Sequence, residues 1–288
     1  MNEKILATII LILLFLQGCK LPAPQFEFSK VLWTVDWSSN DKYIAIGGNS
    51  NELKILSGID FKEIKTYPID NTITKLKWHP NNNLLAISTQ FSKPSLILDI
   101  KTEKLIKLDS VAEGARGLGW NFNGKYLAVG DYEGQLIIYS VEGEFLKKIK
   151  IDPKVITGLS WHPSKNIITT VGTRIGIYNL DTDSLKMINP REEEVLMLCV
   201  EWHPSGSFFV TGDYGDYDYN YPALLQYWDS SGKKIREIKA SKAEYRNLRW
   251  SSNGTHLATA SEKVRIWSKE GEEKLISKKK SQKVYYGE

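Results

Sequence analysis

The chain has 288 residues and a formal net charge of +4, with 42% hydrophobic and 25% charged residues. This composition is that of a folded chain and excludes extensive disorder, and a single all-β domain of about 250 residues is ordinary. The positive charge is spread along the chain without a basic face interleaved with aromatic residues, so nucleic acid is not an expected partner.

Residues 1–18 have the pattern of an export signal. Lys4 supplies a short positive region, and Ile5 to Leu16 is an uncharged apolar run of 12 residues. A helix that spans a bilayer needs about 20 residues, so the run suits a signal peptide better. A plain secretory signal and an N-terminal anchor helix are the alternatives to the more specific interpretation that follows.

The end of this run, Leu16-Gln17-Gly18-Cys19, resembles the lipobox of bacterial lipoprotein signal peptides. The resemblance implies cleavage before Cys19, acylation of Cys19 with palmitate or a similar chain, and attachment of the mature protein to a bacterial membrane. Lys20, in place of an aspartate, favours the outer membrane in a cell that has two. Residues 19–30 then form a tether with a possible strand at Gln25 to Ser29.

The stretch from Trp120 to Tyr139 predicts three short antiparallel strands. Asn123-Gly124 lies between two apolar runs, which is typical of a hairpin whose turn residues both have positive φ. The glycine-flanked segment Gly130 to Gly134 predicts a second turn before the third strand.

The same unit recurs around six tryptophans, which are separated by 41, 42, 41, 41 and 48 residues: Trp37, Trp78, Trp120, Trp161, Trp202 and Trp250. A period near 40 residues with several short strands is the signature of propeller blades. Each unit ends in a strand that alternates charged and apolar residues, as an exposed edge should. We predict a single all-β, six-bladed β-propeller of four-stranded antiparallel blades over residues 31–277.

A seventh blade is not expected, because only residues 19–30 and 278–288 remain in the mature chain. Ring closure is expected from Gln25 to Ser29 or from Lys283 to Tyr286, with the first segment favoured. Residues 278–288 form a basic C-terminal tail that includes Lys278 to Lys280. A solvated terminus or contact with anionic lipid would both suit it.

The repeat resembles the WD-repeat β-propeller family at three strand ends: Trp78-His79-Pro80, Trp161-His162-Pro163 and Trp202-His203-Pro204. The Trp-Asp pair that names the family occurs at Trp228-Asp229, but the Gly-His pair that opens the family's blades is absent. The resemblance covers residues 31–277 and implies a protein-binding propeller. The family's hydrogen-bonded tetrad is therefore not expected here.

Catalytic chemistry is not expected. His79, His162 and His203 share one repeat position, which places them in different blades, so we interpret them as structural turn residues. The sequence contains no nucleophile elbow, phosphate loop or zinc-binding helix, and no Cys/His spacing typical of a structural metal site. We expect no catalytic residue, no cofactor and no metal, and we expect Cys199 to be a buried thiol.

The fifth blade contains the one irregularity of the repeat, an enlarged turn from Asp213 to Pro222. Long loops in compact domains are often functional, and tyrosine is frequent in binding hot spots. The candidate partner-binding residues here are Tyr214, Tyr217, Tyr219 and Tyr221. A solvated loop without a partner, and a calcium site at Asp213, Asp216 and Asp218, are the alternatives.

The position four residues before each tryptophan supplies the other candidate partner-binding residues. In the resembling family this position often faces a binding surface, and here it holds Trp33, Arg116 and Arg246, with Tyr245 adjacent. Strand-end packing is the alternative interpretation. Together the patterns predict an exported bacterial lipoprotein that binds an envelope protein or peptide without catalysis. An enzyme or a small-ligand or glycan-binding propeller with a site at the central channel mouth, and a purely structural envelope component, are the rival hypotheses.

Overall fold

The computed structural model describes residues 31–91, 93–111, 113–216, 218 and 220–277. The expected signal peptide, Cys19, the tether and the basic tail therefore lie outside the described residues, as do both segments expected to close the ring. Every regular element of the described part is a β-strand.

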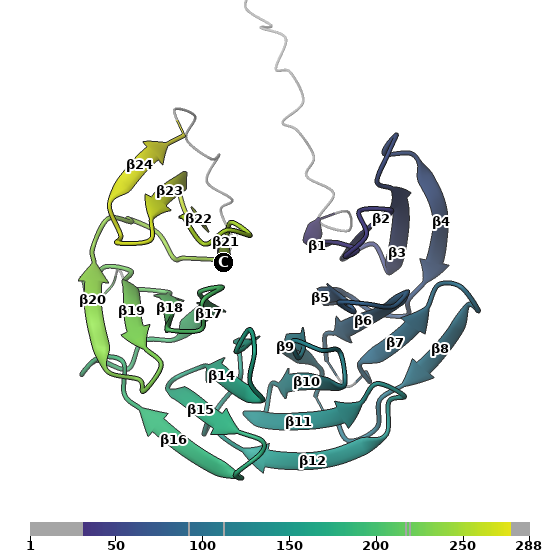
Figure 1. Cartoon of the computed structure of the whole chain (residues 1–288), viewed down its shortest axis with the longest axis horizontal. Helices are drawn as coiled ribbons and strands as arrows, with labels where there is room; N and C mark the ends of the chain where they lie inside the picture. The colour runs from purple at the N-terminus through teal and green to yellow at the C-terminus, as the bar shows by residue number, and fades with distance from the viewer. Residues whose placement is uncertain (1–30, 92, 112, 217, 219, 278–288) are drawn as a thin grey trace, which may run out of the picture.

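The strands form six antiparallel sheets, each built from four consecutive strands and arranged around a common centre (Figure 1). The predicted six-bladed architecture is confirmed. The first three blades are β1 (Leu32–Trp37), β2 (Tyr43–Gly48), β3 (Glu52–Ser57) and β4 (Glu63–Pro68); β5 (Ile73–Trp78), β6 (Leu84–Thr89), β7 (Leu96–Asp99) and β8 (Lys104–Lys107); and β9 (Ala115–Trp120), β10 (Tyr126–Asp131), β11 (Gln135–Ser140) and β12 (Phe145–Lys150). The last three are β13 (Gly158–Trp161), β14 (Ile167–Val171), β15 (Ile175–Asn179) and β16 (Ser184–Ile188); β17 (Met197–Trp202), β18 (Phe208–Asp213), β19 (Leu225–Asp229) and β20 (Lys234–Ile238); and β21 (Asn247–Trp250), β22 (His256–Ala260), β23 (Val264–Ser268) and β24 (Glu273–Ile276).

The turn at Gly124 differs from the predicted primed hairpin. Gly124 has φ +77°, whereas Asn123 does not have positive φ. The side-chain oxygen of Asn123 instead accepts a hydrogen bond from the backbone N–H of Lys125 at 3.0 Å. A Cβ on Gly124 would lie 2.1 Å from Nε2 of His79 in the preceding blade, so the glycine is required by packing between blades as well as by φ.

The strand-end histidines join neighbouring blades. Nδ1 of His79 accepts backbone N–H bonds from Asn81 and Asn82, so Nε2 carries the proton and donates to the carbonyl of Gly124 at 2.9 Å. The ring also packs edge-on against Trp120. The equivalent groups are His162 with Gly206 and Trp202, and His203 with Gly254 and Trp250. Burial lowers the pKa of His79 and of His162. The structural interpretation of these three histidines is confirmed.

The junction between the first and sixth blades is open. Figure 1 shows the ring interrupted between β1–β4 and β21–β24, and these two blades do not pack together as consecutive blades do. Trp37 is 47% exposed and Val35 62% exposed, whereas the tryptophans of the other five blades are only 4% to 8% exposed. Val264 on the opposite face of the junction is also exposed. Both end blades already have four strands from within residues 31–277, so neither lacks a strand that a terminal segment would supply.

Candidate functional site

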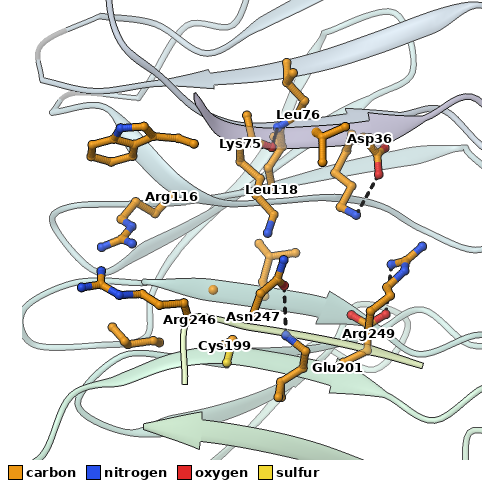
Figure 2. A pocket seen from close by; sticks show the side chains of 18 of the residues that line it. Asp36, Lys75, Leu76, Arg116, Leu118, Cys199, Glu201, Arg246, Asn247 and Arg249 are labelled. Carbon is orange, nitrogen blue, oxygen red and sulfur yellow. Dashed lines mark hydrogen bonds and ion pairs between the residues drawn. The ribbon is translucent and has the colours of Figure 1, made fainter. Parts of the chain in front are cut away.

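A central cavity of about 560 Å³ lies where the six inner strands, β1, β5, β9, β13, β17 and β21, converge (Figure 2). Five cationic side chains and two carboxylates line it. The starts of neighbouring inner strands are held together by threonine hydroxyls, since Thr74 Oγ1 lies 2.5 Å from the carbonyl oxygen of Ala115 and Thr157 Oγ1 lies 2.5 Å from that of Met197. The lining is therefore polar at its upper end and rigidly spaced.

The two carboxylates of the cavity are both neutralised. Asp36 accepts a hydrogen bond from the backbone N–H of Trp78 at 2.8 Å and pairs with Lys77 at 3.4 Å. Glu201 pairs with Arg249 at 3.0 Å. A catalytic acid or base would need a carboxylate or imidazole that is free to exchange protons, and no histidine lies among the lining residues.

Two cations of the cavity, Lys75 and Arg116, have no carboxylate within ion-pair distance among the described residues. Burial lowers the pKa of the Lys75 amine to about 8, helped by the charge of Lys77. The side chain nevertheless remains partly accessible from the channel, so a solute can reach it. Figure 2 shows Lys75 pointing into the pocket, with the guanidinium groups of Arg116 and Arg246 turned toward each other at one side.

Cys199 also borders the cavity, but as a neutral thiol. Its Sγ donates to the carbonyl of Tyr245 at 3.1 Å, and burial raises its pKa to about 12. The expectation of a buried thiol is confirmed. A thiol held in this state is a poor nucleophile.

The structure brings three of the predicted contact residues together. Trp33, Arg116 and Arg246 all line the central cavity, and Trp33 is 42% exposed. Arg246 is held by Glu244, with 2.8 Å between Nε and the carboxylate. Tyr245 is different, because its side chain is fully buried with Cys199 and Trp250 in the core. The expectation that Tyr245 contributes to a binding surface was therefore wrong, since neighbouring residues entering a strand point to opposite sides.

Exposed aromatic residues follow the second strand of three blades. We call the surface on which inner strands start and second strands end the top face; it carries Trp33, Arg116 and Arg246 at its centre. Phe91, Tyr132 and Tyr214 lie around this centre, and Phe91 stacks on Tyr132 with 6.0 Å between ring centroids. Phe91 is 63% and Tyr214 45% exposed. Sequence analysis missed Phe91 and Tyr132, although they stand 13 and 12 residues after their tryptophans, as Tyr214 does.

The enlarged turn of the fifth blade is fixed at its base by a buried ion pair. Asp213 accepts backbone N–H bonds from Gly215 at 3.0 Å and Leu224 at 2.7 Å, and it pairs with Arg191 at 3.1 Å. Burial raises the pKa of Asp213 against these hydrogen bonds and the charge of Arg191. The Arg191 guanidinium also lies over the ring of Tyr221, 5.5 Å from its centroid.

These contacts bear on the remaining expectations for this turn. Tyr217 and Tyr219 lie outside the described residues, whereas Tyr214 is exposed on the top face. Asp213 is occupied by Arg191 and two backbone amides, which removes it from the three carboxylates of the calcium alternative. Among the described residues, no group of three acidic, histidine or cysteine side chains is placed to hold a metal ion. The described part also has no helix of the length and apolar character needed to cross a bilayer.

Comparison with known proteins yields a family and several distant relatives. A family model described as the WDR19 first β-propeller matches residues 33–203. The chain is 20% identical over 205 residues to eukaryotic translation initiation factor 3 subunit I of Kluyveromyces lactis, an alignment that covers 65% of this chain and 59% of that protein. It is 24% identical over 197 residues to the same subunit of Aspergillus oryzae, covering 62% and 56% of the two chains.

A third relative is the intraflagellar transport protein 80 homolog of Mus musculus, which is 25% identical over 206 residues. This alignment covers 68% of the present chain but 25% of the mouse protein. The chain therefore spans less than two thirds of the length of each of these relatives. None of the three is named for an enzymatic activity.

Proposed function

The chain belongs to the WD-repeat β-propeller family represented by the first β-propeller of WDR19, and on this premise we propose that it is a non-catalytic platform that binds a partner protein on its top face. WD propellers typically act as protein-interaction scaffolds. The observation that carries the proposal is the gathering of exposed or half-buried Trp33, Phe91, Tyr132 and Tyr214 around Arg116 and Arg246 on one face.

The composition of this face fits a binding hot spot. Tryptophan, tyrosine and arginine are the residues most enriched where a few side chains carry the binding energy. The blades hold these residues in fixed positions, so little conformational entropy is lost on binding. Ion pairs on both lining carboxylates, by contrast, leave no group suited to general acid or base chemistry in the cavity.

A photo-crosslinking experiment tests the platform. A photoreactive phenylalanine analogue placed at Phe91 or Tyr214 is expected to give one discrete adduct with a partner protein in native membranes. The matched control is Phe145, which is equally exposed on the outer strand β12 and far from the top face. Adducts of equal yield and variety at Phe145, or no discrete adduct at either top-face position, would refute the proposal.

Trp33→Ala is expected to weaken partner binding tenfold or more, equivalent to about 1.4 kcal/mol or more. The physical reason is loss of a large, partly exposed indole beside two cations at the centre of the face. The measurement is the crosslinking yield at Phe91 as a function of propeller concentration. Phe145→Ala serves as the control, and equal binding by both variants would remove Trp33 from the contact.

We further propose that the platform is exported and attached to a bacterial membrane, the outer one where two exist, by a lipid on Cys19. The support is the sequence pattern alone: a charged start, a 12-residue apolar run and Leu16-Gln17-Gly18-Cys19. An envelope protein or peptide is then the partner that the platform would meet.

The chain's two cysteines offer a direct test of the anchor. Cys19→Ser is expected to abolish incorporation of radiolabelled palmitate and to move the protein from the detergent-rich to the aqueous phase. Cys199→Ser is the matched control, because its thiol is buried and should keep full labelling. Labelling that survives in the Cys19→Ser variant would overturn lipidation at this residue.

A further inference from the structure

We propose that the central cavity binds an anion that carries two or more carboxylate or phosphate groups. The inference goes beyond the platform, because it stands on the charges inside the cavity and requires no partner protein. It concerns the same cavity whose rim carries Trp33, so its test is built on Lys75, which is not part of the proposed contact.

The charge balance of the cavity favours an anion. Lys77 and Arg249 are used by Asp36 and Glu201, which leaves Lys75 and Arg116 without carboxylate partners among the described residues. Arg246 adds a third cation whose partner, Glu244, is not one of the lining residues. A surplus of one sign in a confined cavity concentrates ions of the opposite sign.

The surplus has a measurable effect on Lys75. Burial lowers the pKa of its amine to about 8, and Lys77 lowers it further, while Glu201, Cys199 and Asp36 oppose the shift. The charged groups that face it are Lys77 on its own strand, Asp36 on β1, Arg116 on β9, Glu201 on β17, and Arg246 and Arg249 on β21. A bound anion would supply the counter-charge that the protein does not provide.

Size and geometry suit a small organic anion or a short acidic side-chain cluster. The cavity of about 560 Å³ lies within the range of ligand pockets, roughly 300–1,000 Å³. Guanidinium groups bind carboxylates and phosphates through paired N–H bonds, and Arg116 and Arg246 are turned toward the same space (Figure 2). One anionic group can lie between these arginines while another reaches the Lys75 amine.

Calorimetric titration of the full chain at low ionic strength tests the proposal with three probes: citrate, inorganic phosphate and hexaglutamate. Saturable one-to-one binding of at least one probe is expected. Binding of citrate or phosphate would identify a free small anion as the ligand, whereas binding of hexaglutamate alone would identify an acidic protein segment. No binding of any probe at millimolar concentration would overturn the inference.

Variants of Lys75 separate a specific site from general attraction to a basic protein. Lys75→Met is expected to weaken binding tenfold or more, whereas Lys75→Arg keeps it. Lys62→Met is the control, since that side chain is 83% exposed on the first blade, away from the cavity. Equal weakening by Lys62→Met and Lys75→Met would show unspecific attraction and refute the site.

The pH dependence gives a second readout that misfolding would not produce. Wild-type affinity is expected to fall as pH rises from 7 to 9, because the Lys75 amine loses its charge around its pKa of about 8. Cys199 stays a neutral thiol in this range because burial raises its pKa to about 12. Lys75→Arg should bind with little change over the same range, and a wild-type affinity that does not fall would contradict the role of Lys75.

Discussion

Trp202→Ala is expected to lower the free energy of unfolding by about 3–5 kcal/mol, whereas Trp37→Ala is expected to lower it by about 1 kcal/mol. The two tryptophans occupy the same repeat position, at the end of the inner strand of their blades. Urea denaturation followed by circular dichroism measures both variants against the wild type.

The difference follows from what each indole contacts. Trp202 is 4% exposed, packs against His162 and Phe209, and donates its indole N–H to the hydroxyl of Thr169 at 3.0 Å. Its removal leaves a cavity between two blades and a hydroxyl without its partner. Trp37 is 47% exposed and packs edge-on against Phe61, because no preceding blade covers it.

The comparison also tests the open junction itself. If the first and sixth blades were packed together, Trp37 would be covered as Trp202 is, and the two substitutions would cost similar amounts. A cost for Trp37→Ala close to that for Trp202→Ala would therefore show that the junction is closed in solution. Trp120→Ala, at a third junction, is the internal standard and should behave as Trp202→Ala does.

The sequence predicts the blades well because each blade is defined by local signals. The tryptophan spacing and the alternation of outer strands place all 24 strands within four-stranded sheets. What happens between the first and last blades is not a local property. Trp37 has the same neighbours in sequence as its equivalents, so its exposure depends only on whether another blade meets it.

The candidate site is predicted in part for a similar reason. Repeat position places Trp33, Arg116 and Arg246 correctly at the cavity, because six strands that start together bring equivalent residues together. Tyr245 was chosen by adjacency, and the side-to-side alternation of a strand buries it while exposing Arg246. Phe91 and Tyr132 become visible when the turn position is compared across blades. Lys75 carries no sequence signal, since its chemistry arises from the residues of other blades that face it.

Asp213→Ala is expected to lower the free energy of unfolding by about 3–5 kcal/mol, a large effect for a loop-base residue. The substitution leaves Arg191, whose side chain is 8% exposed, without its buried partner. It also removes the acceptor for the backbone N–H groups of Gly215 and Leu224. Buried donors without acceptors carry a desolvation cost that an exposed loop would not. Urea denaturation again provides the measurement.

Asp218→Ala is the matched control, because Asp218 is exposed on the same loop and should change stability by no more than about 0.5 kcal/mol. Removing both partners in Arg191→Met/Asp213→Ala should restore part of the loss, since the uncompensated buried charge disappears. Tyr214 follows Asp213 directly, so Asp213→Ala should also lower crosslinking yield at position 214 while leaving that at Phe91 unchanged. If Asp213→Ala costs no more than Asp218→Ala, the ion pair does not fix this loop, and the position of Tyr214 on the top face must be held by the strand pairing of β18 with β17 alone.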